Sequence, residues 1–214
     1  LYDSMPNHAV AWQQSMEVFG IRMTAHDAYA SEGARGVDTI RMMVMQQQGR
    51  SIDEQEAQRM YDEKTRLFHL MKEAPVMPGV KELMAQIHAQ GLTIGVVTGS
   101  GQRPLINRLL TDFGEDLADD CIVTAYDVKR GKPNPDPYLM GLQKAGGLQP
   151  SEAIVVENAP LGIRAGVAAG IYTIAVNTGP LPDQTLLDAG ANILFPSVKD
   201  LAKDFLKVMT TATL

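Results

Sequence analysis

The spacing of hydrophobic residues changes near Pro75 and divides the chain into two parts. Before Pro75, apolar side chains recur at intervals of three and four residues, which predicts amphipathic helices. The expected helices are Met5 to Phe19 with Gly20 as its C-terminal cap, a short one between Thr24 and Gly33, one through Val37, Ile40 and Val44 that stops at Gly49, and one from a capping box of Ser51 and Glu54 to Met71. The first part is therefore predicted to be a small helical bundle.

After Pro75, short apolar runs rich in β-branched residues alternate with helical patterns. The expected strands are 92–98, 121–126, 153–156, 171–176 and 192–195. Their almost unbroken hydrophobicity indicates burial on both faces. Strands that alternate with helices predict right-handed crossovers and an α/β fold, a Rossmann-like doubly wound parallel sheet.

Composition and charge remove several classes of function. The 214 residues carry 19 Lys and Arg against 25 Asp and Glu, which gives a net charge of −6. Such a chain has no electrostatic surface for a nucleic-acid backbone or an anionic membrane. No apolar run approaches the roughly 20 residues of a membrane span, and the single cysteine, Cys121, excludes a disulfide scaffold. A cytoplasmic protein is expected, with no nucleic-acid or membrane partner.

Chemistry is expected just after the strands, because ligands of such sheets bind outside the carboxyl ends of the strands. The first informative junction is Thr98-Gly99-Ser100-Gly101. Its two hydroxyls and two glycines suit a loop whose N–H groups wrap around a phosphate. An ordinary glycine-rich turn that caps the next helix is the alternative.

The second junction holds Lys132, which stands between Gly131 and Pro133. Pro133, Pro135 and Pro137 fix the path of this loop, so its lysine can serve as a point cation for a phosphate or a carboxylate. The alternative is a solvated loop lysine that contributes little to the core.

The third junction is Glu157-Asn158, which follows the apolar run 154–156. Asn158 stands before Ala159-Pro160 and is a good helix N-cap. Glu157 needs another explanation, because a carboxylate at the mouth of a buried strand requires a partner. A hard cation such as Mg²⁺ is a natural one.

Taken in chain order, the three junctions resemble motifs of the haloacid dehalogenase-like (HAD) hydrolase superfamily. The similarity is to the branch that contains β-phosphoglucomutase and sugar phosphatases. Residues 131–138 are similar to its Gly-Lys-Pro-x-Pro-x-Pro segment, and residues 156–170 to its segment around Glu-Asp and Ala-Gly. Residues 1–4, with His8 and Trp12, are similar to the stretch just after the family's catalytic Asp-x-Asp-Gly.

The resemblance implies a division into domains and a mechanism. Residues 5–75 would form an inserted α-helical cap domain, and residues 1–4 and 76–214 the α/β core. In the family, an aspartate attacks a phosphate monoester with the help of Mg²⁺, and the aspartyl-phosphate passes its phosphoryl group to water or to a sugar hydroxyl. The substrate would be a small phosphorylated metabolite and the protein a monomer.

The resemblance also assigns roles to the junction residues. Thr98, Gly99 and Ser100 would hold the transferring phosphoryl group, and Lys132 would balance its charge. Glu157 and Asn158 would hold the metal. Asn158 stands where many relatives have an aspartate, so its amide oxygen would bring one negative charge less to a Mg²⁺ site.

The cap is expected to choose the substrate. Arg35 is the candidate for reaching an anionic or hydroxylated substrate from a cap loop, and a surface arginine is the alternative. His8 is expected to be a substrate-side hinge histidine that senses cap closure, or else a packed imidazole.

One part of the family pattern is missing. Neither aspartate of Asp-x-Asp is present in the 214 residues, and Asp3 does not replace them because it aligns with the cap hinge. The expectation is that an apolar strand with these aspartates precedes Leu1. A chain without that central strand would leave its two neighbours with unpaired backbone groups and is expected to be unstable or inactive.

Several functions stay open. A Mg²⁺-dependent phosphatase of sugar or polyol phosphates is preferred, and a β-phosphoglucomutase-type mutase is second, because residues 33–36 hold a displaced form of its Gly-x-x-Arg. A phosphonate hydrolase would need an early cap lysine, whereas the first lysine is Lys64. If the protein truly starts at Leu1, the expected function is that of a non-catalytic binding module.

Overall fold

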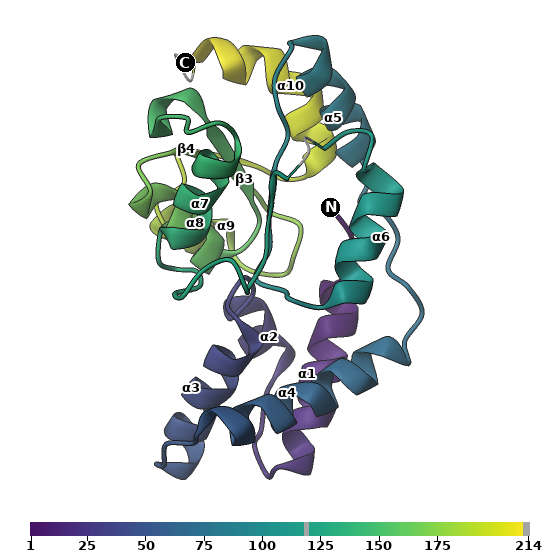
Figure 1. Cartoon of the computed structure of the whole chain (residues 1–214), viewed down its shortest axis with the longest axis vertical. Helices are drawn as coiled ribbons and strands as arrows, with labels where there is room; N and C mark the ends of the chain where they lie inside the picture. Colours follow the sequence, from purple (N-terminus) through teal and green to yellow (C-terminus); the bar gives the residue numbers. More distant parts are fainter. Residues whose placement is uncertain (118–119, 212–214) are drawn as a thin grey trace.

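The structure, a computed structural model, describes residues 1–117 and 120–211 and shows a helical bundle beside an α/β core (Figure 1). The bundle consists of α1 (Met5–Val18), α2 (Ala25–Ala30), α3 (Gly36–Gln48) and α4 (Glu54–His69). The core contains α5 (Val80–Ala89), α6 (Arg103–Phe113), α7 (Asp136–Lys144), the short 3-10 helix η1 (Pro150–Glu152), α8 (Pro160–Ala168), α9 (Asp183–Asp188) and α10 (Val198–Thr211). Its strands are β1 (Val96–Val97), β2 (Ile122–Val123), β3 (Ile154–Glu157), β4 (Tyr172–Val176) and β5 (Ile193–Phe195). None of the described helices is long and apolar enough to cross a membrane.

Local signals place several helix ends in the bundle where the sequence predicts them. Thr24 caps α2, and a capping box joins its side chain and backbone to Asp27. Gly49 ends α3 with φ at +65°, a left-handed conformation that favours glycine. The bundle then buries an apolar cluster of its own: Ala9, Trp12, Met16, Ile21, Met23, Ala28, Ile40, Met43, Val44 and Met60.

The start of α4 differs from the prediction. A capping box of Ser51 and Glu54 is wrong, because the N-cap residue is Asp53, whose carboxylate accepts a hydrogen bond from the amide of Glu56 at 2.7 Å. Serine and aspartate are both strong N-cap residues. Ser51 and Asp53 are only two residues apart, so the path of the chain after α3 determines which of them becomes the N-cap of α4.

The strands pair in parallel and form two separate sheets. β1 pairs with β2, and β3, β4 and β5 form the second sheet in that order. Val96 lies opposite Ile122 in the first sheet, and Ile154 lies opposite Tyr172 in the second. The predicted α/β fold with parallel strands is therefore confirmed.

The first two strands are shorter than predicted. Of the run 92–98 only Val96–Val97 is a strand. The amides of Val96 and Thr98 donate to the carbonyl oxygens of Cys121 and Val123 at 2.9 Å, so the backbone of Val97 faces the opposite edge, where no described strand pairs with β1. Pairing on one edge alone leaves much of the run without ladder hydrogen bonds.

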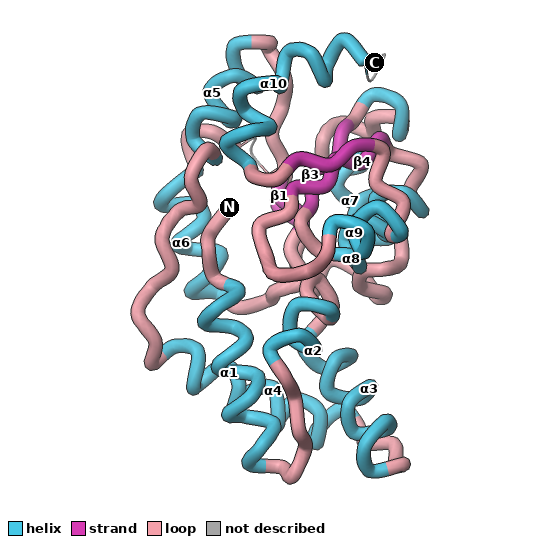
Figure 2. Tube along the Cα trace, turned by 180° about the vertical axis from the view of Figure 1, so that it is seen from behind, coloured by secondary structure: helices cyan, strands magenta, loops and turns pink. Residues whose placement is uncertain are grey.

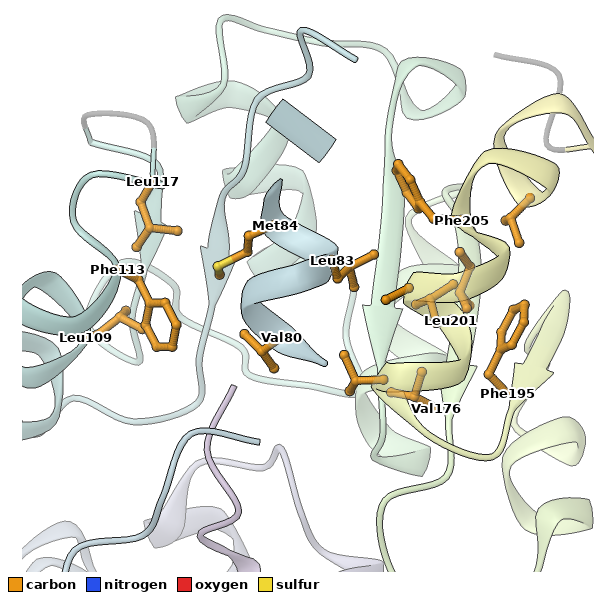
Figure 3. Packing of buried hydrophobic residues seen from close by; sticks show 14 residues of the cluster. Val80, Leu83, Met84, Leu109, Phe113, Leu117, Val176, Phe195, Leu201 and Phe205 are labelled. Atoms are coloured by element: carbon orange, nitrogen blue, oxygen red, sulfur yellow. The ribbon is translucent and has the colours of Figure 1, made fainter. Parts of the chain in front are cut away.

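Helices cover both faces of the sheets, and Figures 1 and 2 show α5 and α10 on one side of the strands and α7, α8 and α9 on the other. The cluster on the first side includes Val80, Leu83, Met84, Leu109, Phe113, Val176, Phe195, Leu201 and Phe205. In Figure 3, the side chains of α5 lie between those of α6 and those of α10. Of the described strands only β4 is buried over most of its length, whereas Val96 and Val97 of β1 are half-buried and Val156 of β3 is 41% exposed, so the predicted burial on both faces holds for β4 alone.

Two segments connect the bundle to the core and run side by side. Tyr2 and Val76 form an antiparallel bridge between them. Arg108 on α6 holds both segments, because its Nη2 donates to the carbonyl oxygen of Ala74 at 2.6 Å and its guanidinium lies 4.2 Å from the ring centroid of Tyr2. The core thus anchors the bundle at both crossings.

Candidate active site

The three strand-end junctions lie together on the side of the core that faces the bundle. The Thr98 loop follows β1, the Lys132 loop leads into α7, and Glu157 ends β3. The Nζ atom of Lys132 joins them, because it donates to the carbonyl oxygen of Val97 at 3.1 Å and to the carboxylate of Glu157. The structure therefore brings together residues that the sequence places far apart.

Lys132 and Glu157 form a buried ion pair. Lys132 is only 7% exposed, so the alternative of a solvated lysine is wrong. The Oε1 atom of Glu157 accepts from Lys132 and from the hydroxyl of Tyr138 at 2.7 Å, and Oε2 accepts from the amides of Asn158 and Ala159 at 3.1 and 3.2 Å. Burial is the largest influence and raises the pKa of Glu157, but the charge of Lys132 and the hydrogen bonds from Lys132, Tyr138 and Ala159 together outweigh it and lower the net pKa. Glu157 is therefore ionised and holds Lys132 in place.

The hydroxyls of the Thr98 loop order the loop itself. Thr98 Oγ1 accepts from the amide of Ser100 at 3.1 Å, and Ser100 Oγ accepts from the amide of Gln102 at 3.2 Å. The N-cap position of α6 is Gln102, whose side chain makes no capping bond. The amides of Gly99 and Gly101 donate to none of the described residues, so they are available to an anion.

The loop between α2 and α3 lies directly on these junctions. A Cβ atom on Gly99 would stand 2.7 Å from the carbonyl oxygen of Gly33 and 3.1 Å from that of Ala34. A Cβ atom on Gly33, whose φ is +89°, would stand 3.4 Å from Cδ of Lys132. Glycine at both positions lets the bundle and the core touch at the site.

Glu32, in the same loop, was not predicted as a site residue. Its Oε1 atom accepts from Nδ2 of Asn158 at 2.9 Å, and the same amide donates to Oγ1 of Thr178 at 3.1 Å. The predicted role of Asn158 as an N-cap is wrong, because Ala159 is the N-cap of α8. Burial raises the pKa of Glu32 to about 7. A lone glutamate in a loop gives no local signal for a contact 126 residues away.

Glu32 and Asn158 carry oxygens that could bind a divalent cation. Oδ1 of Asn158 and Oε2 of Glu32 accept no hydrogen bond from a described residue, whereas both oxygens of Glu157 are engaged. Carboxylate and amide oxygens are the ligands that Mg²⁺ prefers, so this donor set fits the ion. The described residues contain no group of three or more His, Cys, Asp or Glu that could hold a metal. A complete coordination sphere would therefore need further oxygens.

Arg35 does not extend into the site. Its Nε and Nη2 atoms donate to the carboxylate of Asp38 at 2.7 and 3.0 Å. Its aliphatic part packs against Gly131, and the residue is absent from the described lining of the site cavity. The geometry thus gives no support to the prediction that Arg35 reaches a substrate.

His8 and Lys64 face each other on the bundle side of the site. Nζ of Lys64 lies 2.8 Å from Nδ1 of His8 and 4.9 and 5.3 Å from the ring centroids of Phe68 and Trp12. Lys64 is 3% exposed, and no described carboxylate forms an ion pair with it. Burial lowers the pKa of Lys64 to about 7 and, together with Lys64, lowers that of His8 to about 3.

Replacement of Lys64 with Met is expected to alter how stability depends on pH. In the folded chain the pKa of Lys64 is lowered to about 7 from 10.5. Above pH 7 the unfolded chain therefore binds a proton that the folded chain has lost, and the wild type gains stability relative to Lys64→Met as the pH rises to about 10. His8 titrates below this window. The measurement is urea unfolding of the wild type and Lys64→Met between pH 7 and about 10. A constant difference between their free energies of unfolding would contradict the lowered pKa of Lys64.

A cavity of about 1060 Å³ extends from the site between the two sheets. Its described walls include Val96 and Val97 of β1, Val155 and Val156 of β3, and Lys64 of the bundle. β1 and β3 do not pair with each other. The cavity thus separates the edges of two parallel strands.

Comparison with known proteins identifies what the chain is similar to. The family model described as haloacid dehalogenase-like hydrolase matches residues 1–176. Hexitol phosphatase A of Escherichia coli is 41% identical over 117 residues, which cover 53% of this chain and 53% of that protein. The validoxylamine A 7'-phosphate phosphatase of Streptomyces hygroscopicus is 40% identical over 108 residues, 50% of each chain. The matched segment thus spans about half the length of these curated relatives.

A solved structure resembles the chain over its whole length. It is a Bacteroides vulgatus protein provisionally named beta-phosphoglucomutase, with 47% identity and a TM-score of 0.93. The alignment covers 100% of this chain and 86% of that one. The fold, with a helical bundle on a parallel α/β core, is therefore shared.

Proposed function

The chain belongs to the haloacid dehalogenase-like hydrolase family. We propose that it contributes to a Mg²⁺-dependent phosphohydrolase, which hydrolyses small phosphorylated sugars or polyols through an aspartyl-phosphate intermediate. One observation carries this proposal: the buried ammonium of Lys132 lies beside a loop whose Gly99 and Gly101 amides are open to an anion. A fixed cation next to free amides suits a phosphoryl group. The names of the two phosphatase relatives agree with a phosphate monoester as substrate.

The attacking aspartate would lie on a further strand between β1 and β3. Within the part of the chain that the structure describes, no strand pairs with the facing edges of β1 and β3, and residues of both strands line the cavity between them. A parallel strand in this position would satisfy both edges. Its carboxyl end would emerge beside Thr98 and Glu157, so an Asp-x-Asp there would face the phosphoryl group.

The residues of this chain would position and stabilise that group. The amides of Gly99 and Gly101 and the hydroxyl of Thr98 bind the phosphoryl oxygens, and Lys132 offsets the charge that develops during transfer. Glu157 orients the ammonium of Lys132 through their ion pair. The loop at Gly33 excludes water from the same site because it touches Gly99.

The oxygens of Glu32 and Asn158 would hold Mg²⁺. When bound, the ion would polarise the phosphoryl group and offset its negative charge. In this arrangement the carboxylate of Glu32 supplies the charge that Asn158 lacks. The sequence prediction that Glu157 and Asn158 hold the metal stays open for Asn158, whereas Glu157 acts through Lys132.

Hydrolysis is preferred to mutase activity. A mutase of the family would place an arginine at the position of Gly36, to bind a second phosphate. Here Gly36 lies against the ring of Tyr61, and Arg35 is bound to Asp38 and does not line the cavity. The buried Lys64 is the observation that keeps the mutase as second candidate, because it is a cation on the bundle side of the same cavity.

The test is a phosphate-release assay on the chain that carries the proposed Asp-x-Asp strand. Hexose, hexitol and nucleotide monophosphates are compared, and the isomerisation of a hexose 1-phosphate to its 6-phosphate is followed in parallel. We expect phosphate release to exceed isomerisation and to stop in excess chelator. Faster isomerisation would favour the mutase, and no turnover of any substrate would favour a binding module.

Exchange of charge between Glu32 and Asn158 is expected to move Mg²⁺ affinity in opposite directions. Glu32→Gln removes a carboxylate from a hard-cation site and should weaken Mg²⁺ binding about tenfold or more, whereas Asn158→Asp adds one and should tighten it. The double variant Glu32→Gln/Asn158→Asp keeps one carboxylate and one amide with their hydrogen bond reversed, so its affinity should approach that of the wild type. Calorimetric titration with Mg²⁺ measures all four proteins without turnover. Equal affinities in the wild type and Glu32→Gln would remove Glu32 from the site.

A further inference from the structure

Gln102 connects the core to the bundle through one end of its amide. It stands at the N-cap position of α6, but its side chain does not cap the helix. Instead Nε2 donates to the hydroxyl of Tyr61 at 3.1 Å and to Oγ1 of Thr65 at 2.9 Å, both on α4. The two donors of the amide are therefore used between the domains.

The other end of the same amide has no partner. Among the described residues, Oε1 of Gln102 is the one buried side-chain nitrogen or oxygen without a hydrogen bond. Native structures rarely leave a buried acceptor unpaired, and each exception calls for an explanation. Gln102 lines the site cavity together with Ser100 and Tyr61, so a ligand in that cavity can supply the missing donor.

The position of Gln102 places this acceptor next to the phosphoryl site. Its own amide N–H donates to Ser100 Oγ at 3.2 Å, and Ser100 belongs to the loop that also contains Thr98 and Gly99. A phosphate held by that loop would direct its ester group into the cavity that Gln102 lines. Oε1 of Gln102 is therefore placed to contact the leaving group rather than the transferred phosphoryl group.

The surroundings fix the position of the Tyr61 hydroxyl that the amide contacts. Tyr61 packs against Gly36 so closely that a Cβ atom there would lie 2.0 Å from the tyrosine ring, and only glycine leaves the ring in place. The hydroxyls of Tyr61 and Thr65 then engage Nε2. A free carbonyl oxygen accepts a hydroxyl proton and repels an anion.

We propose that Gln102 is a specificity-determining residue that accepts a hydrogen bond from a hydroxyl group of the leaving alcohol. The inference rests on the proposed phosphohydrolase function and deepens it. The preferred substrates are monophosphates of polyhydroxylated alcohols, and a second phosphate or a carboxylate at this position is disfavoured.

The test compares hexitol 6-phosphate with n-hexyl phosphate, which has an alkyl leaving group without hydroxyls. Gln102→Met has similar size and no acceptor, so the ratio of kcat/KM for hexitol 6-phosphate to that for n-hexyl phosphate should fall about tenfold or more. Gln102→Glu is the matched control: it retains an acceptor, its carboxylate can receive bonds from both α4 hydroxyls, and its ratio should stay near that of the wild type. Thermal unfolding of each variant confirms that the fold is retained.

Three outcomes would overturn the inference. If the ratio of the two kcat/KM values stayed unchanged in Gln102→Met, including through an equal loss of kcat/KM on both substrates, Gln102 would only link the bundle to the core. A wild-type preference for a bisphosphate that Gln102→Met abolishes would mean that the NH₂ group faces the ligand. Failure of the wild type, tested with the proposed Asp-x-Asp strand, to hydrolyse any of the monophosphates compared above would refute the proposed function, and the inference with it, whereas the first two outcomes leave that function intact.

Discussion

Replacement of Lys132 with Ala is expected to lower kcat at least about a hundredfold, the scale observed when one preorganised electrostatic group is removed from a transition state. The ammonium is 7% exposed and lies between Val97 and Glu157, so solvent screens little of its interaction with the phosphoryl group. The same change should also destabilise the fold by roughly 3–5 kcal/mol, because it leaves the carboxylate of Glu157 buried without its cation. The location of Lys132 on a loop suggested little effect on folding, and its burial reverses that expectation.

A double variant separates the two effects. Lys132→Met/Glu157→Gln removes both charges, so chemical denaturation should show most of the lost stability restored. Its kcat should remain as low as that of Lys132→Ala, because the cation is still absent. If Lys132→Ala kept a kcat near that of the wild type, the lysine would be structural and the proposed mechanism would be wrong.

Replacement of Gly99 with Ala is expected to lower kcat/KM about a hundredfold, because a displacement of about 1 Å near the reacting groups can cost that much. The new Cβ would stand 2.7 Å from the carbonyl oxygen of Gly33, which is backbone and cannot rotate away. The loop between α2 and α3 must therefore retreat from the site, and water enters. The φ of Gly99 is not in the left-handed region, so alanine adds no backbone strain there, but the contact with a backbone oxygen should also lower stability.

The matched control for Gly99→Ala is Gly141→Ala. Gly141 also has an ordinary φ, and its Cβ would meet only a side-chain atom, Cγ2 of Val97, at 3.3 Å. Its kcat/KM should stay within a few-fold of the wild type. Wild-type activity in Gly99→Ala would show that the loop need not touch Gly99 during turnover.

Local patterns in the chain were sufficient to predict the architecture and the edge of the sheets at which the three junctions meet. Helix periodicity and the caps at Thr24 and Gly49 depend on neighbours a few residues away, so local pattern is sufficient for them. The continuous apolar runs identified the parallel strands, although only β4 is buried over most of its length. Because the carboxyl ends of parallel strands share one edge, the order of the junctions at Thr98, Lys132 and Glu157 was enough to predict that they meet.

The contacts of each candidate site residue depend on packing between segments that lie far apart in the chain. Glu32 bonds to Asn158 across 126 residues, and Lys64 faces His8 across 56. Such contacts leave no periodic or adjacent signal in the chain, so Asn158 looked like a helix cap. Arg35 likewise looked free for substrate, although Asp38 one helical turn away holds it.

The charge states of the site were also decided by folding. Lys132 and Lys64 are both lysines in a sequence that gives no measure of their exposure, and both become buried. One gains the carboxylate of Glu157, and the other gains aromatic rings and a histidine. Burial without a carboxylate lowers the pKa of Lys64 to about 7. Residue type fixes which groups can ionise, but desolvation and the partner that packing supplies fix whether they do.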